Sequence, residues 1–367
     1  MKLLFAIKSI NGEGGGAERV LVDICNGLAA RGHQVVILTF DPPDGDSFYA
    51  LDAAITRMDA AICIPGKPVP RFSLFLAMPR LRRLIDSVDA DLIIPFMHSI
   101  YIPLAVALLG MNKKIVASEH TDFAHYRSRK LQGFLATAIE YLIKTKTVPS
   151  LPVLREYPAW RRGHIHVLPN PIDLNQYSRS KAPTAPPHLL SVGRLAEEKN
   201  HIDLIRAFAQ VSPDFPEWTL RIIGEGELRE FLEAEIVRLG IQSRVTLPGV
   251  SRDVAAAYAA ASVVVLPSLY ESFGLVAAEA LASERPVLSF DNCLGIAEMV
   301  KNEKNGILVS GGGGSAKRVS NLAEGLARLM DDSELRVNLG HKGPASVQQY
   351  ALQNVVDSWE RFLLSLV

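Results

Sequence analysis

The chain has 367 residues, 48% of them hydrophobic, and its 39 basic and 39 acidic residues give a formal net charge of zero. This length favours two domains, each with its own core, and the charge balance argues against non-specific nucleic-acid binding. The charge is uneven, because residues 1–170 carry +5 and residues 171–367 carry −5.

Apolar runs alternate with amphipathic stretches along the chain. The alternation predicts an α/β protein with parallel sheets in both halves, with strands near 2–7, 34–40, 91–96, 114–118, 188–193, 219–223, 244–247, 263–266 and 286–290. The segment 174–187, with three prolines, is expected to link the two halves, and a last helix is expected at about 348–366.

A glycine-rich loop, residues 12–19, follows the first predicted strand and leads into a helix. Glycine allows backbone amides to approach a ligand closely. The loop has neither the Gly-Lys-Ser/Thr ending of a Walker loop nor a regular G-x-G-x-x-G spacing. By itself it is compatible with a flexible connection as well as with a phosphate site.

The segment 71–84 mixes large apolar side chains with four arginines: Arg71, Arg80, Arg82 and Arg83. This composition is typical of a helix that lies on a membrane surface. A packed helix with an arginine-rich wet face is the other interpretation, and Pro79 would kink or begin the helix. More basic charge follows at residues 126–130 and 161–162.

The predicted strand 188–193 ends in Gly193-Arg194, and Lys199 precedes an amphipathic helix. Open α/β sheets bind ligands at the carboxyl ends of their strands. An arginine fork and a lysine point charge suit a diphosphate. A lysine at a helix N-terminus opposes the helix dipole, so an anionic partner accounts for it better than solvent does.

The strand 263–266 leads into a loop and helix that carry two carboxylates, Glu271 and Glu279, with Gly274 between them. A strand, a glycine loop and a helix N-terminus form a common phosphate site. One carboxylate can reach a ribose and the other a sugar ring, with the helix N-terminus facing a diphosphate. The pattern indicates a nucleotide sugar; two solvated glutamates are the alternative.

These motifs, in this order, resemble the retaining nucleotide-sugar glycosyltransferases of family 4, which have the GT-B fold. The resemblance runs nearly end to end and also includes Ser118-Glu119-His120, residues 168–173, Gly224-Glu225-Gly226 and Asn305-Gly306. The Gly-Gly-Ala-Glu-Arg loop at residues 15–19 and the Ser-Glu-His triplet are similar to bacterial enzymes that add sugars to lipid-linked oligosaccharides.

The resemblance implies two Rossmann-like parallel-sheet domains facing each other across a cleft. An acceptor-binding domain would span 1–173 and would also include the C-terminal helix, 348–367, which crosses back to it. A nucleotide-sugar-binding domain would span 183–347. The implied reaction transfers a hexosyl or N-acetylhexosaminyl residue, with retention, from a UDP-linked donor to a hydroxyl of a glycan acceptor, itself lipid-linked. Such a step belongs to the assembly of bacterial cell-surface polysaccharide or other glycans.

The resemblance also assigns roles to individual residues. Arg194 and Lys199 would hold the leaving diphosphate in place of a metal, since the sequence has no Asp-x-Asp triplet and no His-Glu-x-x-His. Glu279 would accept from the ribose hydroxyls, and Glu271 would hold the sugar and stabilise charge at C1. His120 would bind the sugar or a phosphate-linked oxygen from the opposing domain. The backbone amides expected to cradle the phosphates belong to Gly15, Gly16, Phe273, Gly274 and Leu275.

No cofactor is expected, and the nucleotide sugar is a substrate. Three cysteines without metal or redox spacing, Cys25, Cys63 and Cys293, predict a reduced, cytoplasmic setting and leave open a place at the inner face of the cell membrane. The N-terminal Met-Lys runs directly into a strand rather than a signal peptide. No apolar run approaches the roughly 18 residues of a membrane span.

Three segments depart from the family pattern: Asn170-Pro171, Ser283-Glu284-Arg285 and the run 311–315. The last, four glycines and a serine, has the composition of a flexible or engineered linker. Two other functions stay open at this point. One is a non-catalytic nucleotide-sugar-binding protein, and the other is a nucleotide-sugar epimerase of the same fold.

Overall fold

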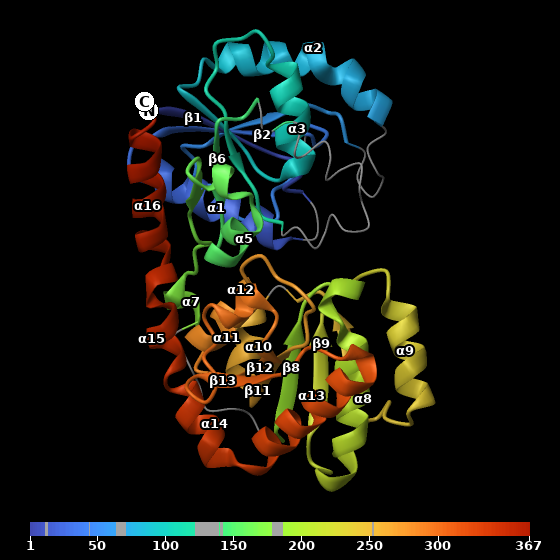
Figure 1. Ribbon diagram of the computed structural model, residues 1–367. Helices are drawn as coiled ribbons and strands as arrows, with labels where there is room; N and C mark the ends of the chain where they lie inside the picture. The colour runs from blue at the N-terminus through green and yellow to red at the C-terminus, as the bar shows by residue number, and fades with distance from the viewer. Residues whose placement is uncertain are drawn as a thin grey trace. The chain divides into compact units, whose positions relative to one another are not determined.

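The computed structural model describes residues 1–11, 14–43, 45–63, 71–121, 139, 142–177, 186–251 and 253–367, with only the backbone of residues 71–75. The chain divides into two compact units (Figure 1). Unit 1 comprises Met1–Pro171 and Leu352–Val367, and unit 2 comprises Ile172–Ala351. The sequence placed the boundaries at 173, 183 and 348; in the structure residues 172–177 and 348–351 belong to unit 2.

Unit 1 is built on parallel strands. Its sheet runs β3-β2-β1-β4, and isolated parallel bridges from Ile93 to Ile115 and from Phe96 to Ser118 join it to β5-β6-β7. The elements are β1 (Lys2–Ile7), α1 (Gly16–Ala29), β2 (Gln34–Thr39), β3 (Thr56–Asp59), α2 (Arg71–Val88), β4 (Leu92–Pro95), α3 (His98–Ala107), β5 (Val116–Ser118), β6 (Thr145–Val148), α5 (Leu151–Glu156), α6 (Ala159–Arg162), β7 (Ile165–Val167) and α16 (Leu352–Leu364).

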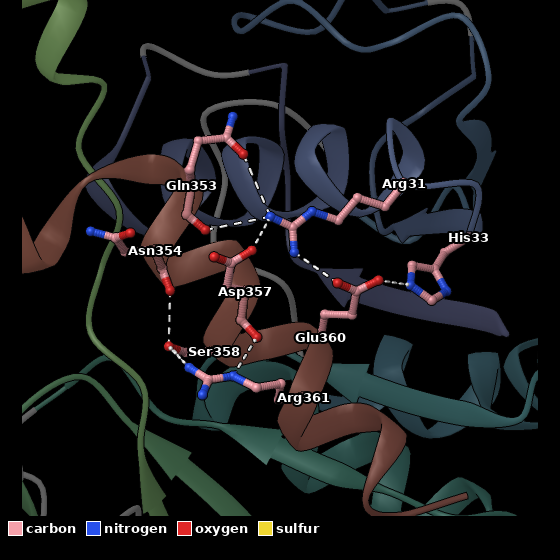
Figure 2. Close-up of polar contacts among 8 residues, drawn as sticks. All are labelled: Arg31, His33, Gln353, Asn354, Asp357, Ser358, Glu360 and Arg361. Carbon is pink, nitrogen blue, oxygen red and sulfur yellow. Dashed lines mark hydrogen bonds and ion pairs between the residues drawn. The ribbon is translucent and has the colours of Figure 1, made fainter.

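Helix α16 lies against α1 and completes the core of unit 1. A side chain added at Gly27 would come within 2.5 Å of Val356, so glycine allows the close approach of the two helices. Trp359 is buried, and its ring stacks on Phe96 with centroids 6.1 Å apart. Figure 2 shows the polar edge of this contact, where Glu360 lies 2.8 Å from both Arg31 and His33; the other residues drawn are Gln353, Asn354, Asp357, Ser358 and Arg361.

Unit 2 has one parallel sheet, in the order β10-β9-β8-β11-β12-β13. From β8 the chain runs outward to β9 and β10, and it then returns to β11 on the other side of β8. Such a switch point opens a crevice outside the carboxyl ends of the two central strands, where ligands bind. A ligand site is therefore expected at the ends of β8 (His188–Val192) and β11 (Val263–Leu266).

Helices cover both faces of this sheet. Besides β8 and β11, the strands are β9 (Thr219–Ile223), β10 (Val245–Gly249), β12 (Val287–Phe290) and β13 (Gly306–Val309). The helices are α7 (Leu174–Tyr177), α8 (His201–Val211), α9 (Arg229–Arg238), α10 (Val254–Ala260), α11 (Leu275–Ala282), α12 (Leu294–Ala297), α13 (Gly314–Asp331), α14 (Ser333–Gly340) and α15 (Gly343–Val347), with 3-10 turns Glu197–Lys199, Ser212–Asp214 and Gln348–Tyr350.

The structure differs from the sequence-based expectation in several segments. Strands β3, β6, β7 and β13 were not predicted, and the last α-helix begins at Leu352, after a 3-10 turn. The expected linker 174–187 begins with helix α7, whose Tyr177 is buried. The glycine-rich run 311–315 is not a linker, because Gly313 is the N-cap of α13 and Gly314 and Ser315 are its first residues. Gly313 and Gly314 have φ of +87° and +82°, and the N–H of Gly311 donates to Asp291 Oδ1 at 3.0 Å.

Candidate active site

Two loops leave the neighbouring ends of β8 and β11 and lie side by side. They span residues 193–200 and 267–274, and β8 and β11 pair in parallel, so both loops begin at the same edge of the sheet. The backbone N–H of Leu269 donates to the carbonyl of Glu198 at 2.9 Å. This bond ties the two loops, which carry most of the predicted donor-binding residues.

Lys199 and Glu271, which are 72 residues apart in sequence, meet where these loops touch. Lys199 Nζ donates to Glu271 Oε1 at 2.6 Å, and Ser268 Oγ donates to the same oxygen at 2.9 Å. Both charged side chains keep about a fifth of their surface accessible. A diphosphate that binds Lys199 therefore has to compete with Glu271, so donor binding would redistribute charge within the pair.

Arg194 is at the strand end, but it is also paired. Its Nη2 contacts Glu198 Oε1 four residues on, while 63% of the arginine side chain remains exposed. An ion pair so open to solvent contributes little to stability. Arg194 is consequently available to an incoming anion at small cost.

A third loop, after β9, packs closely on the first. A side chain at Gly224 would come within 2.0 Å of the carbonyl oxygen of Gly193, and one at Gly226 within 2.4 Å of that of Leu195. The N–H of Leu195 donates to the carbonyl of Glu225 at 2.8 Å. The two glycines therefore allow the loops after β8 and β9 to meet backbone to backbone.

The N-terminus of α11 is placed as the sequence predicted. Gly274 is its N-cap, with φ of +85°, and Leu275 is its first residue. Phe273 is buried edge-on against Tyr350, with ring centroids 5.0 Å apart. A residue that the sequence reasoning missed, Gly295, supports the loop, since a side chain there would come within 2.2 Å of the carbonyl oxygen of Glu271.

Glu279 is buried beneath this loop. Tyr177 Oη donates to its Oε1 at 3.0 Å, and Tyr258 Oη donates to its Oε2 at 2.9 Å. Neither tyrosine was singled out from the sequence. The ribose role of Glu279 stays a prediction.

In unit 1 the glycine loop lies at the carboxyl end of β1. Gly15 is the N-cap of α1 and Gly16 is its first residue, whereas Gly12 and Glu13 lie outside the described residues. A side chain at Gly15 would come within 2.2 Å of Glu18 Oε2. The first amides of a helix have no backbone partner within it, but the Glu18 carboxylate accepts from its own backbone N–H here, so the predicted anion would have to compete with that carboxylate.

His120 follows β5 and is held on several sides. Its Nε2 lies 2.9 Å from Ser118 Oγ, which also accepts from Thr147 Oγ1 at 2.9 Å, and its ring stacks on Phe96. Burial lowers the pKa of His120 to about 4, although Glu119 and Asn170 oppose the shift. The imidazole is therefore neutral near pH 7 and acts there as a hydrogen-bonding group rather than a charge.

Glu119 anchors the backbone that carries His120, a role that the sequence did not reveal. Its buried carboxylate accepts from Tyr101 Oη at 2.6 Å and from the N–H of His120 at 3.1 Å. Burial raises the pKa of Glu119, but His98, Lys146 and Tyr101 together outweigh it and lower the pKa to about 2. The carboxylate is thus ionised at any pH at which the protein would be assayed.

Helix α2 is packed on the core and presents an arginine-rich face. Arg80, Arg82 and Arg83 are all exposed, and Arg82 Nη1 also donates to the carbonyls of Ala107 and Leu109 at 3.1 and 2.9 Å. The side chain of Arg71 and the basic segment 126–130 lie outside what the structure describes. Within the described ranges, no helix is long and apolar enough to cross a membrane.

Two further features bear on the predicted basic surface and on metal binding. Arg161, expected to add surface charge, is instead buried and donates from Nη2 to the carbonyl of Ile143 at 3.0 Å. In the part of the chain that the structure describes, no three His, Cys, Asp or Glu side chains gather as they do around a metal ion.

Two parallel-sheet units, with charged loops at the strand-order switch of the second, define the GT-B class of glycosyltransferases. Solved structures of that architecture match the whole chain. Sucrose-phosphate synthase from Thermosynechococcus elongatus has a TM-score of 0.82 at 21% identity and covers 100% of this chain and 98% of its own. Anabaena HepE in complex with UDP and glucose has a TM-score of 0.79 at 20% identity over 100% of both chains.

Sequence comparison agrees. The family model "Glycosyltransferase Family 4" matches residues 14–176, and "Glycosyl transferases group 1" matches residues 175–346. An uncharacterized glycosyltransferase of Haemophilus influenzae is 26% identical over 99% of both chains. A Campylobacter jejuni alpha-1,4-N-acetyl-D-galactosaminyltransferase, named for a diNAcBac-PP-undecaprenol glycan, is 27% identical over 99% of this chain and 98% of its own. The chain belongs to the family-4 glycosyltransferases and is an enzyme of the hexosyltransferase class.

Proposed function

We propose that the enzyme moves a hexosyl or N-acetylhexosaminyl residue from a UDP-linked sugar to a hydroxyl of a lipid-linked glycan, with retention at C1, in bacterial cell-surface glycan assembly. The observation that carries the proposal is the meeting of Lys199 and Glu271 at the switch point of the unit 2 sheet, with exposed Arg194 in the same loop as Lys199. Cations at this place suit a diphosphate, and a carboxylate suits a sugar ring.

The charges in the site fit departure of a nucleoside diphosphate. The C1–O bond to the diphosphate breaks and its electron pair leaves with the phosphate oxygen. Arg194 and Lys199 stabilise that oxygen, while Glu271, released from Lys199, faces the positive charge at C1. The acceptor hydroxyl then bonds to C1 on the same face and gives its proton to the departing phosphate oxygen.

The acceptor side of the proposal rests on unit 1 and on the relatives. Residues 1–170 carry +5, and exposed Arg80 and Arg83 share helix α2 with Leu76, which is 63% exposed. The Campylobacter jejuni relative is named for an undecaprenol-linked substrate. A basic, partly apolar surface suits an acceptor held by an anionic membrane.

The donor is tested by thermal stabilisation and product release. If the donor is UDP-linked, UDP-sugars should raise Tm more than GDP-sugars at the same concentration, because stabilisation grows with the ratio of ligand concentration to Kd. A ligand at 100 times its Kd stabilises a protein by about 2.7 kcal/mol. Acceptor-free enzyme should release UDP slowly, and EDTA should change the rate no more than a few-fold. Tight binding without any release of UDP, with or without a lipid-linked acceptor, would contradict the proposal.

The proposed role of Arg194 in stabilising the leaving diphosphate is tested by a matched pair of arginine variants. Arg194→Ala should lower turnover by about two to three orders of magnitude, the usual effect of losing a group that stabilises developing charge. Arg238→Ala is the control, since Arg238 is 64% exposed and pairs with Glu235 in the same unit. Equal turnover in the two folded variants would remove Arg194 from the mechanism.

A further inference from the structure

A buried polar cluster adjoins the two loops that carry Lys199 and Glu271. Its members, which we call the strut, are Asn200, Asp203, Ser315 and Arg318. Asp203, in the first turn of α8, is 0% exposed, and its Oδ2 accepts from Arg318 Nε at 2.7 Å and from Asn200 Nδ2 at 2.9 Å. Ser315 Oγ donates to Oδ1. The buried carboxylate is therefore balanced by one cation and bonded on both oxygens, as a stable buried charge requires.

Asn200 connects this cluster to both site loops. It follows Lys199 in sequence, and its Nδ2 also donates to the carbonyl of Pro267 at 3.2 Å. One amide group thus holds Asp203 on one side and the start of the loop that carries Glu271 on the other. Asn200 adopts φ of +53°, a left-handed conformation that asparagine tolerates better than most residues because its side chain bonds locally.

The opposite end of the strut comes from α13, more than a hundred residues away. The glycine-rich run places Ser315 and Arg318 at the start of that helix, over Asp203. Asp203 is therefore near the N-terminus of its own helix and bonded to the first turn of another, where a negative charge is favourable. The glycine-rich run, which no feature of the predicted mechanism uses, serves this arrangement.

The strut borders a pocket on one side. A pocket of about 340 Å³ is lined by all four members of the strut and by Leu269. Side chains that border a pocket lack neighbours on that side, so on the pocket side the strut is held by its hydrogen bonds.

We propose that Asn200, Asp203 and Arg318 are positioning residues that fix the separation of Lys199 and Glu271. The inference rests on the proposed glycosyl transfer, in which those two side chains divide the donor between them. The strut touches neither donor nor acceptor and acts through the loops 193–200 and 267–274. Because a displacement of about 1 Å can reduce a rate a hundredfold, loosening the strut should lower kcat without abolishing donor binding.

Two variants test the strut and a third serves as the control. Asn200→Gly keeps the left-handed backbone accessible and removes only the bridging amide. Arg318→Ala removes the cation, and Arg328→Ala removes an arginine from the same helix, where it pairs with exposed Glu303. We expect kcat for UDP-sugar turnover to fall between tenfold and a hundredfold in the first two variants and to stay within twofold in the control, with KM for the donor changing less than kcat.

Hydrogen exchange in the free enzyme gives a readout that does not depend on catalysis. The N–H of Leu269, which bonds across the two loops, should exchange faster in Asn200→Gly than in wild type or Arg328→Ala. The coupling is checked in a Lys199→Ala background, where Asn200→Gly should cost much less turnover, since the two changes act on one unit.

The outcomes separate the strut from the proposed function. Faster exchange at Leu269 in Asn200→Gly and Arg318→Ala, with a loss of kcat, supports the positioning role. Unchanged exchange in both, or an equal loss of kcat in Arg328→Ala, overturns it. If wild type releases no UDP from any donor, the proposed function fails, while exchange at Leu269 still decides whether the strut holds the loops.

Discussion

Replacement of Glu279 tests two roles of one buried carboxylate. Glu279→Ala removes the acceptor that Tyr177 and Tyr258 share, at 3.0 and 2.9 Å. A hydrogen bond to a charged group contributes about 1.5–3 kcal/mol, so the loss of two should lower the free energy of unfolding by roughly 3–6 kcal/mol. That is a large part of the roughly 5–15 kcal/mol that stabilises a whole domain.

The Ala variant is therefore unsuited to binding studies, and Glu279→Gln should replace it there. Glutamine keeps the shape of the side chain and one carbonyl acceptor. Tyr258→Phe removes one of the two bonds to Glu279 and should lower the free energy of unfolding by about 1.5–3 kcal/mol. Urea denaturation of the three variants measures the structural part. Calorimetry of Glu279→Gln with UDP and with 2′,3′-dideoxy-UDP measures the ribose part, because only UDP has hydroxyls for the carboxylate to accept from.

Two results would refute this reasoning. A Glu279→Ala variant within about 1 kcal/mol of wild type would show that the tyrosine bonds contribute almost nothing. If Glu279→Gln lowers the affinities for UDP and the dideoxy analogue equally, the residue does not accept from the ribose. Glu271→Gln is the companion measurement and should lower sugar transfer more than UDP affinity.

Three further predictions concern other parts of the chain. Glu284→Gly should raise the free energy of unfolding by about 0.5–1 kcal/mol in urea denaturation. Glu284 has φ of +56°, and a left-handed backbone costs a non-glycine residue about 1–2 kcal/mol, part of which is offset by the greater chain entropy that glycine has when unfolded. A variant less stable than wild type would contradict this. Wild type should co-sediment with anionic vesicles at low salt, and the double variant Arg80→Glu, Arg83→Glu should not. Arg82 is left unchanged because it bonds the carbonyls of Ala107 and Leu109. If wild type does not bind the vesicles, α2 is a packed helix with a charged face. Stability should fall as the pH drops from 6.5 to about 4, because the unfolded chain takes up protons there that buried His120 and His201, whose pKa values are both lowered to about 4, do not. His120→Gln should reduce that slope and leave the contribution of His201, and an NMR titration of His120 near its usual value would contradict it.

The fold was accessible from the sequence, and so was the proximity of Lys199 and Glu271, which are proposed to bind the donor. The runs around β8 and β11 are apolar on both faces, as strands buried between helices are, and their ends point to Arg194, Lys199 and Glu271. The glycine at position 274 marked the start of α11 because only a few residue types suit its left-handed backbone. These signals are local, and each concerns a few consecutive residues.

The missed features depend on partners far away in the sequence. Strand β6 contains Lys146, which looks exposed in the sequence, yet its Nζ lies buried 3.3 Å from the hydroxyl of Tyr157. Tyr177 lies in a segment that resembles a linker, but it bonds Glu279 from 102 residues away. The role of Asp203 required Arg318, 115 residues later. No periodicity or spacing records such pairings.

Helix α16 has a consequence for the order in which the chain folds during synthesis. Unit 2 begins and ends side by side, since the N–H of Ile172 bonds the carbonyl of Tyr350 at 2.8 Å, so it can close as soon as its own residues leave the ribosome. Unit 1 cannot, because Trp359 and Phe362 fill part of its core. The first 171 residues must therefore wait with an exposed apolar face until unit 2 has been made, and a fault that stalls unit 2 also leaves unit 1 open to proteolysis.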